Sequence, residues 1–261
     1  MKRILRAYPY ILVVALLSAM AVVDAQKLTG DHSKRTSFRD VWHVYAFDDD
    51  VDAAFEVIAD DNSFTPTSLS TADLVEVLWG GSGPTARAFI EGIKPDSTRV
   101  VYPLRTNGTA VKTTSDSLMF FERAWLDSSN SNTDVLTIRD KSGSAAITTL
   151  IAGQHHSYIA HRFSPKKEAN YITNWSVQVP TNTGAVETEL RIYDDWADAF
   201  DIGDDYTVVD AVLMPAGPAL PYQQVFDPPI LIPQYGVALI VGKGENANCD
   251  AKVKMSGYVT R

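Results

Sequence analysis

Five aspartates that lie close together in the sequence could bind a metal ion. They are Asp194, Asp195, Asp201, Asp204 and Asp205, in the segment DDWADAFDIGDD. Calcium takes several oxygen ligands from one loop, so this segment is the better calcium candidate in the chain. It lacks the spacing and the final glutamate of an EF-hand, and acidic loops in so negative a chain are mostly solvated turns. Calcium binding and a solvated loop both stay open here, and a second acidic run, DDDVD at 48–52, is expected to be a solvated turn.

The histidines and the single cysteine offer little chemistry. In HHSYIAH, a strand would place His155 and His161 on one face and His156 on the other, with no carboxylate close in sequence. Surface or half-buried histidines without a metal are therefore favoured. Cys249 stands alone, which excludes an internal disulfide and any zinc site built on cysteines.

No motif for nucleophilic catalysis or phosphate binding is present. The sequence has no Gly-x-Ser-x-Gly, and GGSGPTAR (80–87) lacks both the Gly-Lys-Ser/Thr of a phosphate loop and a following helix. We therefore predict that the protein is not an enzyme and has no catalytic residue, no cofactor-binding residue and no cofactor, with calcium as the one open exception. Two glycosidase carboxylates brought together by the fold would leave no local signature, so a hydrolase stays open as a further alternative.

Aromatic residues are the remaining candidates for a site. Trp175, Trp196, Tyr222 and Tyr235 lie near the ends of predicted strands and in loops, where we expect exposed rings. Such rings stack on sugars and pack against neighbouring subunits, so these four are the candidate ligand or interface residues. The alternative is that they close the ends of a hydrophobic core.

The elements that would position these residues are strands. From Val41 onward, short runs rich in Val, Ile, Thr and aromatic residues are broken by Gly, Pro, Asn and Asp at a spacing of roughly 8–12 residues. This pattern predicts an all-β fold with an N-terminal β domain at 41–152 and a C-terminal antiparallel, jelly-roll-like sandwich at 153–261. SLMFFERAWL is apolar on both faces and predicts a central or interface strand, and Asn107-Gly108 is a strong hairpin signal. LSTADLVEVLW is the best helix candidate after the leader and could equally be a strand.

The segment VETELRIY (186–193) alternates as a half-buried strand does. Val186, Thr188, Leu190 and Ile192 share one face, and Glu187, Glu189, Arg191 and Tyr193 share the other. If this strand pairs with AKVKMSGYV near the C-terminus, its glutamates face Lys252 and Lys254 across a solvated sheet face. Prolines between 215 and 233 indicate short, kinked or edge strands nearby.

The N-terminus and the overall charge narrow the class of protein. Residues 1–25 combine basic, apolar and small residues in the order of a signal peptide, and an uncleaved hydrophobic anchor or an amphipathic or buried helix would look similar. Residues 26–40 are polar and predict an extended arm. The formal net charge of -9 argues against binding nucleic acid, and membrane contact is expected only through an uncleaved leader.

The order of several short motifs resembles a family of uncharacterised tailed-phage virion proteins of the marine type. The matching segments run through Ile90–Ile93, Thr106–Thr109, Val135–Ile138 and Ser164–Ile172, and the similarity extends from about Val41 to Arg261. Members typically have a Pro-Ala-Gly-Lys turn where this chain has Pro165–Glu168, which lacks the glycine. A virion protein assembled inside its host needs no signal peptide, so the leader is either an arm or anchor used in assembly, or the chain is an exported relative.

The resemblance implies a non-enzymatic structural component of a phage particle that acts by assembly. Its place would be capsid decoration, head fibre, or neck or tail, its partners other virion proteins, and its form a homo-oligomer, with a trimer suited to a projecting fibre. The alternative is an exported carbohydrate-binding β-sandwich, secreted or at the cell surface, that binds glycans through Trp175 or Trp196.

Overall fold

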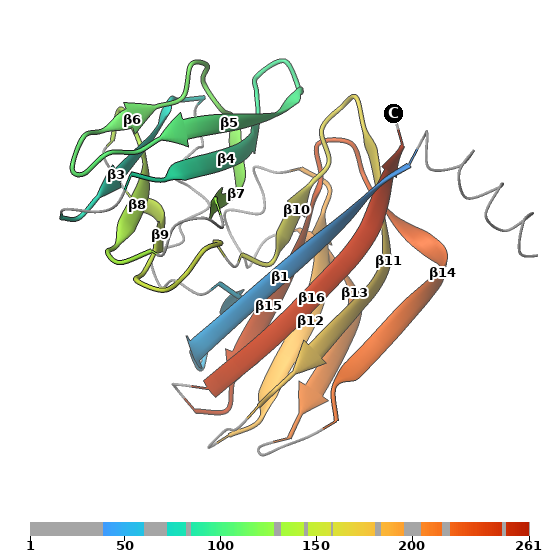
Figure 1. Cartoon of the computed structure of the whole chain (residues 1–261). Helices are drawn as coiled ribbons and strands as arrows, with labels where there is room; N and C mark the ends of the chain where they lie inside the picture. The colour runs from blue at the N-terminus through green and yellow to red at the C-terminus, as the bar shows by residue number, and fades with distance from the viewer. Residues whose placement is uncertain are drawn as a thin grey trace, which may run out of the picture. The chain divides into compact units, whose positions relative to one another are not determined.

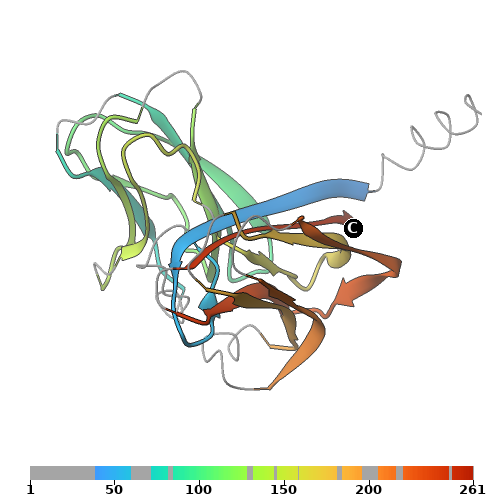
Figure 2. The same ribbon diagram turned by 90° about the horizontal axis from the view of Figure 1, so that it is seen from below.

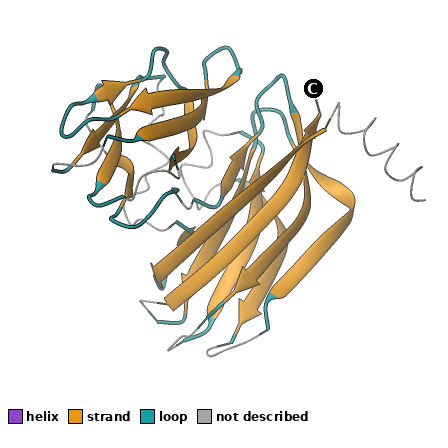
Figure 3. Ribbon diagram, viewed as in Figure 1, coloured by secondary structure: helices purple, strands orange, loops and turns teal. Residues whose placement is uncertain are grey.

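The computed structural model describes residues 39–59, 72–81, 85–127, 132–143, 146–157, 159–180, 184–195, 205–215, 220–246 and 249–260. Within these ranges the chain forms strands and turns and no helix, which confirms the all-β prediction (Figure 3). The predicted leader at 1–25 and residues 26–38 of the predicted arm lie outside the described residues. None of the described segments is a helix long and apolar enough to cross a membrane.

Two sheets pack face to face to form a sandwich (Figures 1 and 2). One sheet has the strand order β1-β16-β11-β14 and the other β10-β15-β12-β13. Their strands are β1 (Arg39–Val51), β10 (His161–Phe163), β11 (Ala169–Gln178), β12 (Val186–Tyr193), β13 (Tyr206–Met214), β14 (Tyr222–Ile232), β15 (Val237–Gly244) and β16 (Cys249–Thr260). The core between them takes apolar side chains from both sheets, among them Trp42, Ile172, Leu190 and Ile240.

One strand of the second sheet is built from two segments that are far apart in the sequence. β2 (Glu56–Val57) pairs with the C-terminal half of β15, and β10 pairs with its N-terminal half, both antiparallel. At the join, the Ile58 amide donates to the Ile240 carbonyl and the Ala160 amide donates to the Ile58 carbonyl. The chain leaves this strand and returns to it at a bridge between Ala59 and Ile159. Residues 60–158 are therefore an insertion within a single strand, and we call them the inserted part.

The inserted part contains two smaller sheets, with strand orders β6-β3-β8-β9 and β5-β4-β7. Their strands are β3 (Val75–Trp79), β4 (Arg87–Ile93), β5 (Arg99–Arg105), β6 (Lys112–Thr113), β7 (Phe120–Leu126), β8 (Leu136–Asp140) and β9 (Ala146–Leu150). Their apolar side chains form one hydrophobic cluster, which also includes Phe163, Leu239 and Val241 of the sandwich. The inserted part and the sandwich thus share buried apolar side chains.

The predicted limits of the first domain are wrong at their N-terminal side. β1 and β2 fall within the predicted range 41–152 but pair with β16 and β15, so they are strands of the sandwich. The helix candidate LSTADLVEVLW contains strand β3, in which Val75, Val77 and Trp79 belong to the hydrophobic cluster. Gly108 adopts a positive φ in a tight turn, as Asn-Gly predicts, but the strands on either side of it, β5 and β6, join different sheets.

The predicted face alternation of 186–193 is confirmed on its inward side, where all four residues are buried. The outward side differs from expectation, because Arg191 and Tyr193 are buried as well. Arg191 lies 4.5 Å from the centre of the Phe55 ring and 4.0 Å from that of Tyr206. The pairing with the C-terminal run that the sequence left open does not occur, since β12 pairs with β13 and β15, while β16 lies in the opposite sheet beside β1 and β11.

Candidate functional site

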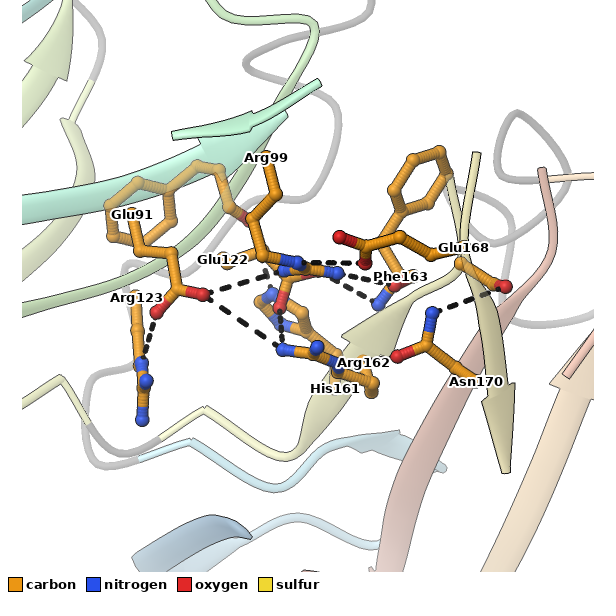
Figure 4. Close-up of polar contacts among 11 residues, drawn as sticks. Glu91, Arg99, Glu122, Arg123, His161, Arg162, Phe163, Glu168 and Asn170 are labelled. Atoms are coloured by element: carbon orange, nitrogen blue, oxygen red, sulfur yellow. Dashed lines mark hydrogen bonds and ion pairs between the residues drawn. The ribbon is translucent and has the colours of Figure 1, made fainter. Parts of the chain in front are cut away.

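A buried ionic cluster lies where the inserted part meets the sandwich (Figure 4). Its members are Glu91 on β4, Arg99 on β5, Glu122 on β7, Arg162 on β10 and Glu168 just before β11. None of the five side chains is more than 9% exposed. Charged groups are rarely buried unless they are paired, so this cluster is the most unusual polar arrangement in the described chain.

Arg99 is the centre of the cluster. Its Nη1 lies 3.0 Å from Glu122 Oε1 and 3.5 Å from Glu91 Oε1. Its Nε donates to Glu168 Oε2 at 3.2 Å, and its Nη2 donates to the Phe163 carbonyl at 2.9 Å. One guanidinium from the inserted part therefore holds two groups of the sandwich, with the fork geometry for which arginine is suited.

Arg162 approaches the same acids from the sandwich side. Its Nη1 lies 3.6 Å from Glu122 Oε2 and 3.9 Å from Glu91 Oε1. Its Nε donates to Asn170 Oδ1 at 3.1 Å, and its guanidinium carbon lies 5.1 Å from the centre of the Trp42 ring. The second arginine is thus held by hydrogen bonding and by an aromatic face as well as by charge.

Glu122 stays ionised although it is completely buried. Burial alone would raise its pKa, but attraction from Arg99 and Arg162 outweighs that effect and holds the pKa at about 2. Glu122 also accepts a hydrogen bond from the Phe163 amide at 3.0 Å. Glu122 has no proton to donate at neutral pH, and its oxygens are already engaged by the two arginines and the Phe163 amide, so it cannot serve as a general acid. The cluster is therefore suited to stabilising the fold rather than to proton transfer.

His161 lies against the cluster as a neutral group. Burial lowers its pKa from the ordinary 6.5, and its Nε2 lies 3.1 Å from the Phe121 carbonyl oxygen. The edge of the Phe120 ring packs against it with the centroids 5.2 Å apart. The sequence favoured a surface or half-buried histidine without a metal, and the structure differs for His161, which is buried at 2% exposure.

The cluster predicts that acid destabilises the protein. The pKa of Glu122 is depressed in the folded state, so the stability that it contributes is full above its ordinary value of 4.5 and is lost as the pH falls towards 2. The shift corresponds to about 3 kcal/mol. His161 acts in the same direction below pH 6.5, because the unfolded chain takes up the proton that the folded chain refuses.

Urea denaturation between pH 7 and pH 3, followed by tryptophan fluorescence, measures this dependence. The exposed Asp205→Asn variant serves as the control and should follow the unmodified protein. In Glu122→Gln the slope below pH 4.5 should be smaller. Identical slopes in Glu122→Gln and the unmodified protein would contradict the assignment.

Sequence reasoning missed this cluster, although one signal was present. SLMFFERAWL was predicted to be a central or an interface strand, and Phe120, Phe121 and Glu122 are indeed buried one after another. An acid within a run that is apolar on both faces must find a buried partner. Its partners could not be named, because Arg99 and Arg162 come from other segments of the chain, on β5 and β10.

The predicted calcium loop is only partly described. Asp194, Asp195 and Asp205 are exposed at the ends of β12 and β13, while Asp201 and Asp204 lie outside the described residues. Among the described residues, the carboxylates close enough to hold a cation are those of Asp48, Asp49 and Asp50, whose ligand atoms lie within 4.8 Å of one another.

The cluster at Asp48 differs from the predicted solvated turn. It lies at the end of β1, and Asp48 is buried while accepting a hydrogen bond from the Asp50 amide at 3.1 Å. Burial is the main cause that raises the pKa of Asp48 to about 8, and the neighbouring charges of Glu56 and Asp50 contribute to this rise. This side chain is therefore largely protonated at neutral pH.

The four candidate aromatic residues have different environments. The expectation that Trp175 is exposed is wrong: it has 0% exposure, and its Nε1 donates to Asp210 Oδ2 at 2.8 Å. Tyr222 is half-buried, and its hydroxyl donates to the same oxygen at 2.6 Å. Tyr235 is exposed in a turn with a positive φ, and Trp196 lies outside the described residues. Trp175 closes the core, as the alternative proposed, because Asp210 satisfies its polar end.

No family model and no curated protein matches the chain. Among solved structures, the CBM22-1-CBM22-2 tandem domain from Paenibacillus barcinonensis Xyn10C is 8% identical over 83% of this chain and 94% of that one, with a TM-score of 0.23. The infectious bursal disease virus Gt strain structure is 9% identical over 85% of this chain and 72% of that one, with a TM-score of 0.20. Similarities of this size assign neither a fold family nor a function. The chain is an all-β protein of several sheets.

Proposed function

We propose that this chain is a non-enzymatic structural component of a phage particle, in a capsid decoration, head fibre, neck or tail position, and that it acts by oligomeric assembly in the virion. The observation that supports this most strongly is the order of the strands in the sandwich. The sequence resemblance to tailed-phage virion proteins supports it independently.

The strand order is that of a jelly roll. If the split strand formed by β2 and β10 counts as the second of eight, the two sheets have the orders 1-8-3-6 and 2-7-4-5. Viral capsid domains and lectins use this arrangement of two Greek keys, so the strand order is compatible with a building or a binding role.

The ionic cluster supports a building role more specifically. It fastens the inserted part to the sandwich through Arg99 and Arg162, each of which contacts groups of both parts. A protein that forms ordered particles needs subunits whose surfaces keep a constant arrangement, and paired buried charges can supply that specificity. The proposed partners are other copies of the chain and other virion proteins.

Peptide mass spectrometry on density-banded particles from the native source tests the proposal. We expect the chain to co-band with a major capsid protein at a constant ratio across gradient fractions. Recovery only from the soluble fraction, with the chain beginning at Gln26, would reject the virion role and favour an exported protein.

A second candidate function, an exported carbohydrate-binding β-sandwich, is favoured by one observation. The outer face of the sheet β1-β16-β11-β14 exposes Tyr45 and carries Tyr171 and Tyr258, whose rings stack at 4.9 Å. His43 and Ser256 lie between them as hydrogen-bonding groups, with Nδ1 and Oγ 2.9 Å apart. Aromatic rings beside polar groups are a common platform for sugars.

For this candidate, Tyr45→Ala or Tyr258→Ala should weaken binding to an immobilised polysaccharide panel about tenfold, because each removes one stacking ring. Affinity electrophoresis of the full chain measures the effect. Tyr206→Ala, on the other sheet, is the matched control and should bind as the unmodified chain does. Absence of retardation on every polysaccharide would reject the candidate.

A further inference from the structure

The outer face of the sheet β1-β16-β11-β14 carries a ladder of paired side chains. Three successive pairs join β1 to β16, and we call them the lysine ladder: His43 with Ser256, Tyr45 with Lys254, and Phe47 with Lys252. Alternate residues of a strand lie about 7 Å apart, so the ladder extends over roughly 13 Å. No described strand lies over this face of the sheet (Figures 1 and 2).

The two lysines of the ladder pack on aromatic rings. Lys252 Nζ lies 5.1 Å from the centre of the Phe47 ring, and Lys254 Nζ lies 5.1 Å from the centre of the Tyr45 ring. Among the described residues, neither ammonium forms an ion pair with a carboxylate. A ring face attracts an ammonium without offering it an oxygen acceptor. Both lysines are therefore held in place while their N–H groups can still bind an anion.

The acids of the same face lie beyond one end of the ladder. Asp250 precedes Lys252 by two residues on β16, and Asp49 follows Phe47 by two residues on β1. Lys254 is four residues from Asp250, about 13 Å along the strand, which exceeds the Debye length of about 8 Å at physiological ionic strength. The face therefore accepts negative charge at Lys254 and disfavours it beside the two aspartates.

The side chains beside the ladder favour a sugar polymer. Asn174 and Ser176 flank the buried Trp175 on β11 and lie on the outer face, where Ser176 is opposite Gln223 of β14. Such amide and hydroxyl groups both donate to and accept from sugar hydroxyls, and aromatic rings stack on the apolar side of a sugar. Small molecules bind in concave pockets, whereas this is an open sheet surface, so it suits an extended chain of sugars.

We propose that the lysine ladder binds an anionic polysaccharide, whose acidic groups contact Lys252 and Lys254 while its rings stack on Tyr45. The inference rests on the second candidate function, sugar binding by this sheet face, and names the class of sugar. Single-stranded nucleic acid is bound by a similar combination of rings and basic groups. The net charge of -9 and the acids beyond the ladder disfavour a backbone that is charged at every unit. They likewise favour a polysaccharide in which neutral sugars separate the charged ones.

Biolayer interferometry of the full chain on immobilised polysaccharides tests the inference. Hyaluronan is compared with its methyl ester, for carboxylates, and κ-carrageenan with its desulfated form, for sulfates. We expect at least one of the anionic polymers to bind about tenfold more tightly than its neutral form, since exposed charge pairs are individually weak. Raising the salt concentration should remove this difference, because the contacts are exposed to solvent.

Three variants locate the site. Lys252→Gln/Lys254→Gln should lower the affinity for the anionic polymer about tenfold and leave that for its neutral form unchanged. Lys141→Gln/Lys243→Gln is the matched control and should bind as the unmodified chain does. It removes the same charge from two exposed lysines outside the ladder, and Lys243 also lies over a ring, 5.6 Å from the centre of Phe55. Lys252→Arg/Lys254→Arg keeps both charges and should keep the binding. Thermal unfolding followed by circular dichroism shows that each variant is folded.

The failure of this inference and the failure of sugar binding are distinguishable. Equal binding to charged and neutral forms, or unchanged binding in Lys252→Gln/Lys254→Gln, would overturn the inference and leave sugar binding in place. Tighter binding to single-stranded oligothymidylate than to every polysaccharide would overturn it in favour of nucleic acid. Binding to no polysaccharide would reject both the inference and the second candidate function, whereas the virion role is tested separately by co-banding.

Discussion

Replacing Glu122 with glutamine is expected to destabilise the protein by about 3–5 kcal/mol, because it leaves two buried arginines with too little negative charge. Glutamine has nearly the same shape and can still accept the hydrogen bond from the Phe163 amide. The decrease in the free energy of unfolding therefore reports the missing negative charge rather than a change in packing. Urea denaturation at pH 7 gives the free energy of unfolding, and hydrogen exchange over β7 and β10 shows whether the two parts separate first.

The control for this change is Arg123→Gln. Arg123 also binds an acid of the cluster, with its Nε 2.6 Å from Glu91 Oε2, but its side chain is 50% exposed. Solvent screens such a pair, so its loss should cost no more than about 1 kcal/mol. Equal costs for the buried and the exposed change would show that the cluster has no special role in stability.

Replacing Trp175 with alanine is expected to cost about 3–5 kcal/mol, the range for removing a large aromatic side chain from a core. The indole is fully buried between the two sandwich sheets and packs edge-on against Tyr222 at 5.7 Å. Its removal leaves a cavity and deprives Asp210 of one of its donors. Thermal unfolding followed by circular dichroism measures the loss.

Tyr222→Phe separates the contribution of hydrogen bonding to Asp210 from that of aromatic packing. It removes the hydroxyl that donates to Asp210 while keeping the ring, so we expect a loss of about 1 kcal/mol. If Trp175 were a ligand-binding residue at the surface, Trp175→Ala would abolish binding while leaving the melting temperature unchanged. That pattern would contradict the buried role.

Local patterns predicted the local structure well. Period-two alternation identified the inward face of 186–193, and Asn107-Gly108 identified a turn, because both depend on neighbouring residues alone. Strand pairing was not predictable in the same way. The C-terminal run was considered as a partner of 186–193, yet β16 lies between β1 and β11 in the other sheet. The alternation within a strand shows which face is buried but not which strand lies beside it.

The candidate site was even less accessible from sequence. Its five charges come from five segments, and each segment taken singly looks like an ordinary strand or turn. A run of consecutive acidic residues is visible in the sequence as a candidate site. A buried ion pair such as Arg99 and Glu122 is not, because the two residues become neighbours only in the folded chain. Trp175 was misjudged for a related reason, since Asp210, which satisfies its indole, is 35 residues away.

The strand that is split between β2 and β10 has a consequence for the order in which the chain folds. β2 has two residues and β10 has three, so neither can hold its place beside β15 alone. The inserted part leaves the ribosome between them and before β15, and its folding brings their ends together at Ala59 and Ile159. The conformational entropy that is lost when β2 and β10 are aligned is therefore lost before the sandwich begins to form. The jelly roll is thus expected to fold last, onto a strand that the inserted part has already assembled.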